Sequence, residues 1–481
     1  MNMLSALILL SLLPLSLAAG GAVAADSQNL PELGDATSGI VSLAKEREIG
    51  QDFLRSLRAQ APTLDDPILQ DYLEHLMYRL ASYSQLQDRR LDVVLIDSPV
   101  INAFAAPGGI VGINYGLFTY GQTEHEISAI LAHELAHLSQ RHFARGVEAG
   151  KKTGVINLAG LLASVILMTT VGGDAGMAAF GATQGLVQNK YLTHSRARES
   201  EADRVGIDTL VEAGMDPRAM AYMFERLERA NRYSSSRVPE FLRTHPVTKS
   251  RISDAYNQTR KYVKETWPPN VTYQLMRTRV TALTTKSPRE AISLFEAGLN
   301  DRDEVKRDAN QYGLVLSLIE DSQTDEATRL LRPLLDKYGS SILFQIAEAD
   351  IHAKAQRYDQ ALELLENALA INPGNYPLTM TYAEVLISAN RPVVAEEFLL
   401  NLSAERKNDE YLWYLLAEAY GLANDIPGVH QARAEFFVLN GNFDQAIKQL
   451  GYAIPLVRGN FQQNAKIKQR IEEIWELRAK H

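Results

Sequence analysis

Two histidines and a glutamate lie close together between Ile127 and Ser139, among apolar residues with helical spacing. Residues four positions apart project from one face of an α-helix, about 6 Å apart along its axis, so His133 and His137 can bind one metal ion. Glu134 lies about 100° around the helix, beside that metal, where its carboxylate can act as a general base towards water. The spacing therefore predicts a zinc-dependent hydrolase with one zinc ion per chain.

The flanking residues predict that this motif lies on a helix. Thr123 and Glu126 have the spacing of an N-terminal capping box, and apolar residues recur every three or four positions after them. A core helix whose histidines only form hydrogen bonds is the alternative. The combination of both histidines with the glutamate favours the zinc helix.

The third zinc ligand must be a histidine or a carboxylate, because the chain has no cysteine. A following His-x-x-Gly-x-x-His pattern fails, since Gln140 and Phe143 occupy the glycine and histidine positions and His142 is one residue out of register. Glu199 and Asp203 lie one helical turn apart in a later segment. They offer a ligand and a carboxylate that could orient a ligating histidine, whereas the alternative is a solvated charged face.

Two more segments are candidates for the active site. Asn102, Ala103 and Phe104 begin a strand that is followed by a Pro-Gly-Gly turn at 107–109 and another strand. An exposed edge strand near a metal can bind an extended peptide by main-chain pairing, although a plain hairpin fits equally well. His245 precedes a proline, which disfavours helix there. We expect a loop that points this histidine into a cleft, or else a surface histidine.

Two roles are open for His245. As a hydrogen-bond donor, it would stabilise the oxyanion that forms when the peptide carbonyl is attacked. As an imidazole ligand, it would fill the fourth zinc position and keep the enzyme latent until a client protein moves the loop.

Residues 1–24 are predicted to be a cleavable signal peptide, followed by a polar segment at 25–39. The leader has no charged side chain, is apolar from Leu4 to Leu17 and ends in a small-x-small pattern. A retained N-terminal anchor is the alternative, because the leader has no lysine or arginine. The formal net charge of −9, without a long basic cluster, argues against a nucleic-acid partner.

Residues 154–173 carry no charge and are long enough to span a bilayer. If Glu199 shares one zinc with His133 and His137, however, both sides of this segment must lie on the same side of any membrane. A single crossing is then excluded. We expect a lid or a membrane-touching helix over the active site rather than a buried core helix.

The C-terminal part predicts a tetratricopeptide array from about residue 280. Alanines recur every 34 residues in two series that are offset by 12: Ala349, Ala383 and Ala417, and Ala327, Ala361 and Ala395. Ala434 and Ala446 keep this offset but begin 17 residues later, so we expect one helix to serve two overlapping pairs. Such arrays form concave surfaces for protein partners, whereas an ordinary helical bundle is the alternative.

Four motifs recur in the order of a known family and together resemble the metallopeptidases related to the heat-shock protease HtpX and the CAAX prenyl protease: Asn102-Ala-Phe-Ala-x-Pro-Gly-Gly109, His133-Glu-Leu-Ala-His137, Glu199-x-x-x-Asp203 and His245-Pro-x-x-x-x-Arg251-Ile. With a leader and a repeat array, the chain resembles the periplasmic members that enhance β-barrel assembly. The resemblance implies that Glu199, rather than Glu201, is the ligand. It also implies a periplasmic location in a Gram-negative cell and a dual role as protease and chaperone. Because unregulated cleavage would conflict with that assembly role, we favour the ligand role for His245.

The combined prediction is a mainly α protein with a gluzincin-type zinc metallopeptidase domain at 40–265, made of helices and a small β-sheet, and a tetratricopeptide α-solenoid at 266–481. The predicted activity is that of a zinc metalloendopeptidase that promotes the assembly of outer-membrane β-barrel proteins and degrades misassembled ones. The predicted partners are unfolded or misassembled β-barrel proteins, the assembly machinery through the repeats, and the membrane surface. The alternative is a chaperone or scaffold with a latent peptidase site.

Overall fold

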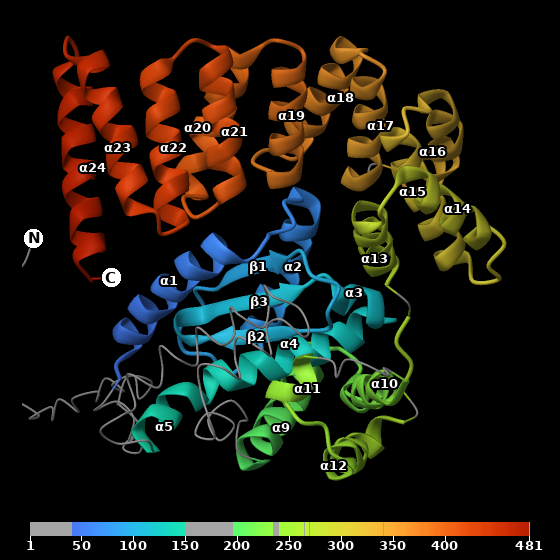
Figure 1. The fold of residues 1–481 in the computed structure, drawn as a ribbon. Coiled ribbons are helices and arrows are strands. Elements are labelled where there is room, and N and C mark those ends of the chain that lie inside the picture. Colours follow the sequence, from blue (N-terminus) through green and yellow to red (C-terminus); the bar gives the residue numbers. More distant parts are fainter. Residues whose placement is uncertain are drawn as a thin grey trace, which may run out of the picture.

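A computed structural model shows an N-terminal part with a small sheet and a C-terminal array of helices (Figure 1). It describes residues 41–149, 196–233, 240–263, 265–268, 270–339 and 341–480. The predicted signal peptide, the polar segment and the apolar segment 154–173 lie outside the described residues. In the described part of the chain, no helix is both long and apolar enough to cross a membrane.

The predicted strands form a three-stranded sheet in the order β1-β3-β2. Strand β1 (Asp92–Ile96) pairs parallel with β3 (Ile110–Asn114), whereas β2 (Ala103–Ala106) pairs antiparallel with β3. The Pro-Gly-Gly turn, η2 (Pro107–Gly109), joins β2 to β3, as expected. Strand β2 therefore forms an edge of this sheet.

Helices cover both faces of the sheet because the strand residues alternate between two cores. Side chains such as Val94, Phe104 and Ile110 pack with α1 (Leu43–Gln60) in one cluster. The alternate residues of the same strands belong to the main core, which includes α2 (Pro67–Ser82) and α4 (Glu124–Ser139). A period of two along a strand separates residues in this way.

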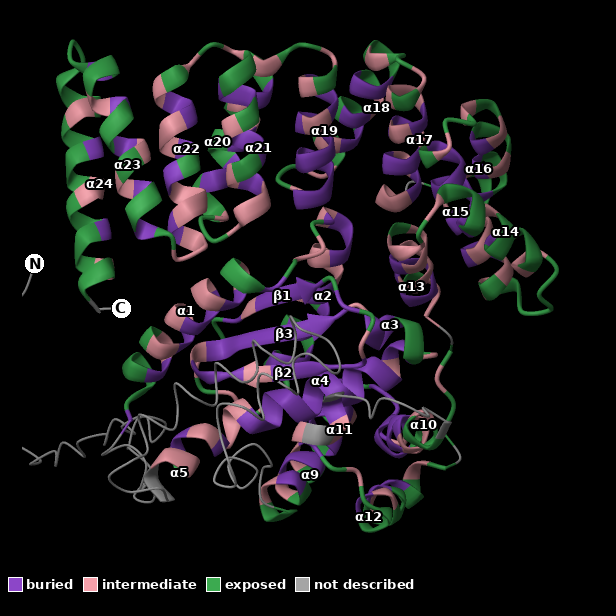
Figure 2. Ribbon diagram, in the orientation of Figure 1, coloured by how far each residue is buried: buried purple, intermediate pink, exposed green. Residues whose placement is uncertain are grey.

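The motif helix α4 is buried along almost its whole length (Figure 2). Its N-cap is Thr123, whose hydroxyl oxygen accepts the backbone N–H of Glu126 at 3.2 Å. The Glu126 carboxylate accepts the N–H of Gln122 at 2.6 Å, one residue before the position that a capping box would use. The sequence prediction of a capped helix is confirmed, with this change of partner.

Helix α9 (Arg196–Glu212) packs against α4 and brings the second motif to the first. Gly206 permits this approach, because a Cβ at that position would lie 3.1 Å from the backbone nitrogen of His133. The remaining elements of this part are α3 (Gly116–Tyr120), α5 (His142–Ala149), α10 (Ala219–Tyr233), α11 (Glu240–Thr244), α12 (Lys249–Thr259) and η4 (Arg260–Tyr262).

The C-terminal array contains successive antiparallel helices, as the alanine spacing predicted. Its elements are α13 (Val271–Thr284), α14 (Pro288–Gly298), α15 (Glu304–Glu320), α16 (Thr324–Tyr338), α17 (Ile342–Lys354), α18 (Tyr358–Ile371), α19 (Tyr376–Ser388), α20 (Pro392–Glu405), α21 (Glu410–Leu422), α22 (Ile426–Leu439), α23 (Phe443–Ala453), η5 (Ile454–Val457) and α24 (Phe461–Lys480).

The turns inside the repeats show the same period. Left-handed residues follow α15, α17, α19 and α21 at a spacing of 34: Ser322, Gln356, Asn390 and Asn424. The next such residue, Gly441, follows α22 only 17 positions later. Helix α22 lies between these two turns and packs against both α21 and α23, which agrees with one helix that serves two pairs.

The array arches over the β1 edge of the sheet and contacts both α1 and α2 (Figure 1). Its first helix is joined to α2 by Arg279, which binds both carboxylate oxygens of Asp66 at 2.7–3.0 Å. Asp66 is also the N-cap of α2. Further along the array, Arg406 binds Glu74 at 2.7 and 3.0 Å. Buried and partly buried ion pairs therefore fix the array against the sheet-containing part.

Candidate functional site

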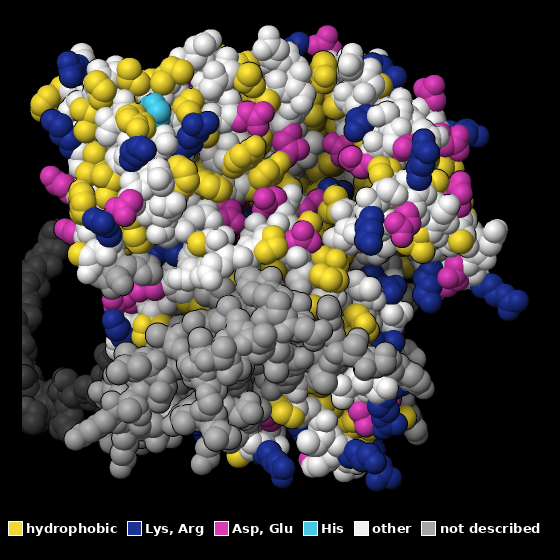
Figure 3. Space-filling view, in the orientation of Figure 1, with side chains coloured by type: hydrophobic (Ala, Val, Ile, Leu, Met, Phe, Trp, Pro, Cys, Tyr) yellow, Lys and Arg dark blue, Asp and Glu magenta, His cyan; other side chains and the backbone are white. Residues whose placement is uncertain are grey.

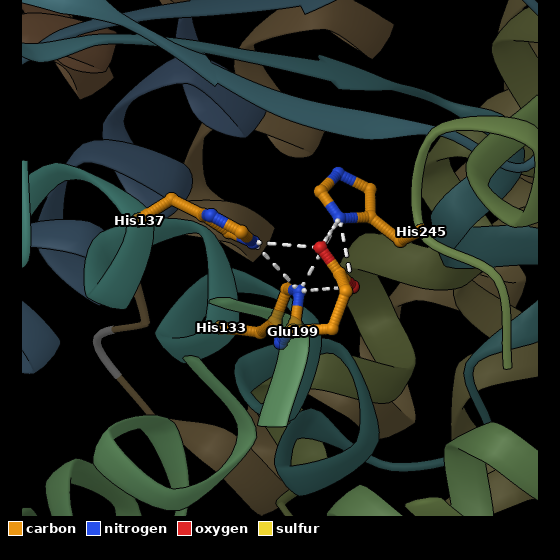
Figure 4. Close-up of side chains that lie close together, drawn as sticks. All are labelled: His133, His137, Glu199 and His245. Carbon is orange, nitrogen blue, oxygen red and sulfur yellow. Dashed lines mark hydrogen bonds and ion pairs between the residues drawn. The ribbon is translucent and has the colours of Figure 1, made fainter. Parts of the chain in front are cut away.

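Four buried side chains from three segments converge on one point (Figure 4). His133 and His137 come from α4, Glu199 comes from α9, and His245 follows α11. Each contributes one possible ligand atom, and these atoms all lie within 4.8 Å of one another. The residues that the separated motifs predicted are therefore brought together by the fold.

The donor set fits zinc. Three imidazole nitrogens and a carboxylate oxygen are ligands that zinc takes in proteins. Nε2 of His137 lies 3.1 Å from Nε2 of His133, and the two oxygens of Glu199 lie 3.5 Å from these nitrogens. Such short separations between buried lone-pair atoms are what a shared cation would stabilise.

His133 is oriented by a chain of polar groups behind it. Its Nδ1 lies 2.9 Å from Oδ1 of Asp203, which leaves Nε2 facing the cluster. Arg251 donates two hydrogen bonds of 2.7 Å to Asp203 and lies 2.9 Å from Glu199. Burial opposes ionisation of Asp203, but the bonds from Arg251 and His133 lower its pKa overall. Asp203 is thus placed as a charged group that orients the His133 ring. Sequence reasoning gave no role to Arg251, which holds Asp203 in this position.

Glu134 lies beside the cluster and not in it. Its Oε2 accepts the backbone N–H of Ala105 on β2 at 2.9 Å. Among the described residues its Oε1 has no hydrogen-bond donor, although Nε2 of His245 lies 3.5 Å away. Burial raises the pKa of Glu134, partly offset by His245 and His133. A buried carboxylate with one oxygen available to a donor suits exchange of a proton with water.

His245 lies in the loop after α11, as expected, and not on the surface. Its Nδ1 faces the cluster at 3.1 Å from Oε1 of Glu199, whereas its Nε2 faces Glu134. The imidazole stacks on Phe241 with ring centroids 4.8 Å apart. The carbonyl of Pro246, the next residue, accepts a hydrogen bond from Arg251. One arginine thus holds both Asp203 and the start of this loop.

The predicted substrate strand reaches the site through its backbone. The backbone N–H of Asn114 donates to the carbonyl of Asn102. Because main-chain groups alternate in direction along an antiparallel pair, the backbone N–H and C=O of Ala103 and Ala105 point away from β3. Ala105 confirms this direction through its bond to Glu134. The Phe104 ring packs on the other face, in the cluster with α1.

His142 has a contact that sequence reasoning missed. It is not placed among the four ligand atoms, but its Nδ1 lies 2.8 Å from Nδ1 of His137. Its Nε2 lies 3.0 Å from Glu201, which is not in the cluster either. Burial lowers the pKa of His142 despite the neighbouring carboxylate. The left-handed residue that turns His142 towards the site has no signature in the sequence.

Comparisons with known proteins show the family of the chain. The profile of Peptidase family M48 matches residues 67–259, and a tetratricopeptide repeat profile matches residues 352–419. The chain is 32% identical to the β-barrel assembly-enhancing protease of Escherichia coli K12, over 95% of this chain and 93% of that protein. The protein of that name from Yersinia pestis is 30% identical, over 93% and 92%.

A more distant relative matches about half of the chain. The mitochondrial metalloendopeptidase OMA1 of Schizosaccharomyces pombe is 28% identical over 47% of this chain and 68% of that protein. Family M48 is zinc-dependent, and the cluster of three histidines and Glu199 can hold one metal ion. On these grounds the chain belongs to the β-barrel assembly-enhancing proteases, a group of M48 zinc metallopeptidases that carry tetratricopeptide repeats.

Proposed function

We propose that this protein is a periplasmic metalloendopeptidase that promotes the assembly of outer-membrane β-barrel proteins and degrades chains that fail to assemble. The observation that carries the proposal is the buried cluster of His133, His137, Glu199 and His245 with Glu134 beside it. Similarity along nearly the whole chain to proteases named for β-barrel assembly supplies the substrate class. The leader at 1–24 supports export to the periplasm of a Gram-negative cell.

We assign zinc binding to His133, His137 and Glu199. When bound, zinc polarises a carbonyl and lowers the pKa of water. Asp203 holds the His133 ring in the orientation that directs Nε2 to the ligand cluster. Glu134 takes a proton from the attacking water and then delivers it to the amine that leaves when the peptide bond breaks.

An extended substrate segment would lie along β2. The outward main-chain groups of Ala103 and Ala105 would pair with it, as an added strand pairs with a sheet edge. Because the side chains of Asn102 and Phe104 are buried, these residues would support the strand rather than contact the substrate by their side chains. The site would then recognise the main chain of the peptide more than its side chains. Such recognition suits misfolded clients that differ in sequence.

His245 favours a latent resting state. With Nδ1 among the ligand atoms and Nε2 towards Glu134, it occupies the space in which a substrate carbonyl and the attacking water would meet. Movement of the loop between α11 and α12 would open this space. The second candidate function, a chaperone or scaffold whose peptidase is mostly latent, rests on this same geometry.

The repeat array would bind clients and the outer-membrane assembly machinery. Apolar side chains gather over the repeat helices on the face shown in Figure 3. Exposed large hydrophobic residues of these helices include Tyr414, Leu422, Ile426 and Tyr452, and several exposed apolar residues on one part of a protein often mark an interaction site. We propose that the metallopeptidase domain comprises residues 40–265 and the repeat domain residues 266–481. We also propose that the protein contacts the membrane surface peripherally.

The central test combines metal analysis of the purified full-length protein with degradation of an unfolded outer-membrane β-barrel protein. An enzyme holds about one zinc per chain and cleaves the client. A protein that holds zinc and binds the client without cleaving it is the scaffold. A protein without zinc contradicts both.

Docking is tested by a Tyr414→Ser, Leu422→Ser double variant in the full-length chain. We expect zinc content to stay as in the parent and co-purification of the assembly machinery to fall. Val263→Ser, an exposed apolar residue of the sheet-containing part, is the matched control. Equal recovery of partners by the double variant and the control would contradict a docking role for these helices.

A further inference from the structure

His137 contacts a second histidine on the side of its ring that faces away from the ligand cluster. Nε2 of His137 points to the cluster, at 3.1 Å from His133 and 3.5 Å from Glu199. Nδ1 of the same ring lies 2.8 Å from Nδ1 of His142. This is the position at which a ligating histidine commonly donates a hydrogen bond to an orienting group.

The direction of each hydrogen bond follows from the ligand role. A ligating imidazole is neutral and uses the lone pair of Nε2, so its one N–H is at Nδ1. His137 therefore donates, and Nδ1 of His142 accepts. Neutral His142 must then carry its own N–H at Nε2, where it donates to Oε2 of Glu201 at 3.0 Å. Both bonds are satisfied by one set of tautomers.

Backbone geometry at the end of α4 makes this contact possible. In a continuous helix a residue five positions later lies about 140° around the axis, and His142 would point away from His137. Helix α4 instead ends at Ser139, and Arg141 is left-handed with φ 49°. This conformation is uncommon for a residue with a side chain, and it turns His142 back towards α4.

Arg141 is held in this conformation by α1 and the residues just before it. Its guanidinium lies 3.2 Å from the carboxylate of Glu46, which is itself buried, and it also donates to the carbonyl of Val41. Residues about 95–100 positions earlier in the chain thus stabilise the turn. A strained residue with several compensating contacts often marks a functional constraint.

We propose that His142, supported by Glu201, is a positioning residue that fixes the ring orientation and tautomer of His137 for zinc binding. The two histidine ligands then differ in how they are oriented. Asp203 contacts His133 directly, whereas the Glu201 carboxylate acts on His137 through an intervening imidazole. Glu201 is partly exposed and also pairs with Arg145 at 3.0 Å, so this chain of groups links the metal site to the surface at α5.

The test measures zinc affinity of the full-length protein by competition with a chelator, and this inference rests on the proposed zinc site. His142→Leu keeps most of the volume and removes both ring nitrogens. We expect its zinc affinity to fall about 10- to 100-fold. His142→Asn places an amide oxygen where Nδ1 was and should recover most of that affinity. His430→Leu, which removes a partly buried histidine of the repeat array, should match the parent.

A second readout separates positioning from packing. Cobalt in place of zinc reports ligand geometry through its visible spectrum, which should change in His142→Leu and return in His142→Asn. Parental affinity in His142→Leu, or equal losses in both variants, would overturn the proposal. If His142→Leu fails to fold, Glu201→Ala decides the matter, because parental zinc affinity there would also overturn it. A parent without zinc affinity would instead refute the proposed function.

Discussion

Arg251 and Asp203 form a buried, two-pronged ion pair, with Nε and Nη2 each 2.7 Å from a carboxylate oxygen. The same guanidinium lies 2.9 Å from Glu199 and donates to the carbonyl of Pro246. A fork of parallel N–H groups is specific to arginine and cannot be reproduced by the point charge of lysine. This arginine connects a ligand, the group that orients His133 and the loop that carries His245.

The first prediction follows from that fork. Arg251→Lys should lower zinc affinity and peptidase activity, because Asp203 and Glu199 lose directed hydrogen bonds although a positive charge remains. Removing one partner of a buried ion pair costs about 3–5 kcal/mol, so Arg251→Ala should also lower the free energy of unfolding clearly. Chelator competition and chemical denaturation measure the two effects. Parental zinc affinity in Arg251→Lys would contradict the role of the fork.

The second prediction separates the base from the ligands. Glu134→Gln should retain zinc and lose hydrolysis, because the amide keeps the shape of the side chain but cannot accept the proton. Glu199→Ala should lose zinc as well as activity. Metal analysis and a degradation assay on both variants provide the comparison. Loss of zinc from Glu134→Gln, or full zinc content in Glu199→Ala, would reject the assignments.

The third prediction concerns latency. His245→Ala should accelerate degradation of an unfolded client if the imidazole blocks the fourth ligand position. If His245 instead stabilises the oxyanion, the same change should slow cleavage by on the order of 100-fold. The rate is compared at equal zinc content, so that metal loss cannot imitate either result. Slower cleavage with zinc retained would decide against the latent state.

The sequence predicted the parts of the site that depend on local spacing. His133, Glu134 and His137 follow from helix periodicity, and Asp203 follows from its one-turn distance to Glu199. Arg251 could not be placed from spacing, because it reaches Asp203 across 48 residues and through a separate helix. The register of His142 excluded it as a ligand, and it is not among the ligand atoms. Its contact with His137 could not be predicted, because the left-handed conformation of Arg141 leaves no signature in the sequence.

For the fold as well, features that depend on local spacing could be predicted, whereas contacts between residues far apart in the chain could not. The 34-residue period predicted the helix pairs and the half-repeat step at α22, because alanine spacing records local helix packing. The position of the array relative to the sheet depends on contacts such as Arg58 with the carbonyl of Asn408, 350 residues apart. No periodic pattern predicts pairs of that kind.

The fourth prediction is a dependence of stability on pH. Asp350 lines a cavity of about 750 Å³ on the array. Burial raises its pKa to about 7, with nearby carboxylates adding to the effect and Arg279 opposing it. Between about pH 4 and pH 7 the folded protein therefore holds a proton that the unfolded chain has released, so this residue lowers stability as pH rises.

Asp350→Asn should consequently raise the melting temperature at pH 8 and change it little at pH 4. Melting curves of parent and variant at the two pH values measure this difference. Glu363→Gln is the control, because Glu363 is exposed on the neighbouring helix α18 and its charge stays in water. A gain in Asp350→Asn that is equal at both pH values would contradict the prediction.

The bond between Asp66 and Arg279 joins the beginning of the metal-binding part to a residue that enters the chain much later. Asp66 caps α2, but its arginine partner comes 213 residues later, on the first helix of the array. All four residues of the ligand cluster precede Arg279 in the chain, so none of them depends on the array for its place in the sequence. The metal-binding half can thus gather its donors while α2 still lacks this anchor. The full set of contacts of the metal-binding half therefore includes a residue of the helices that follow it.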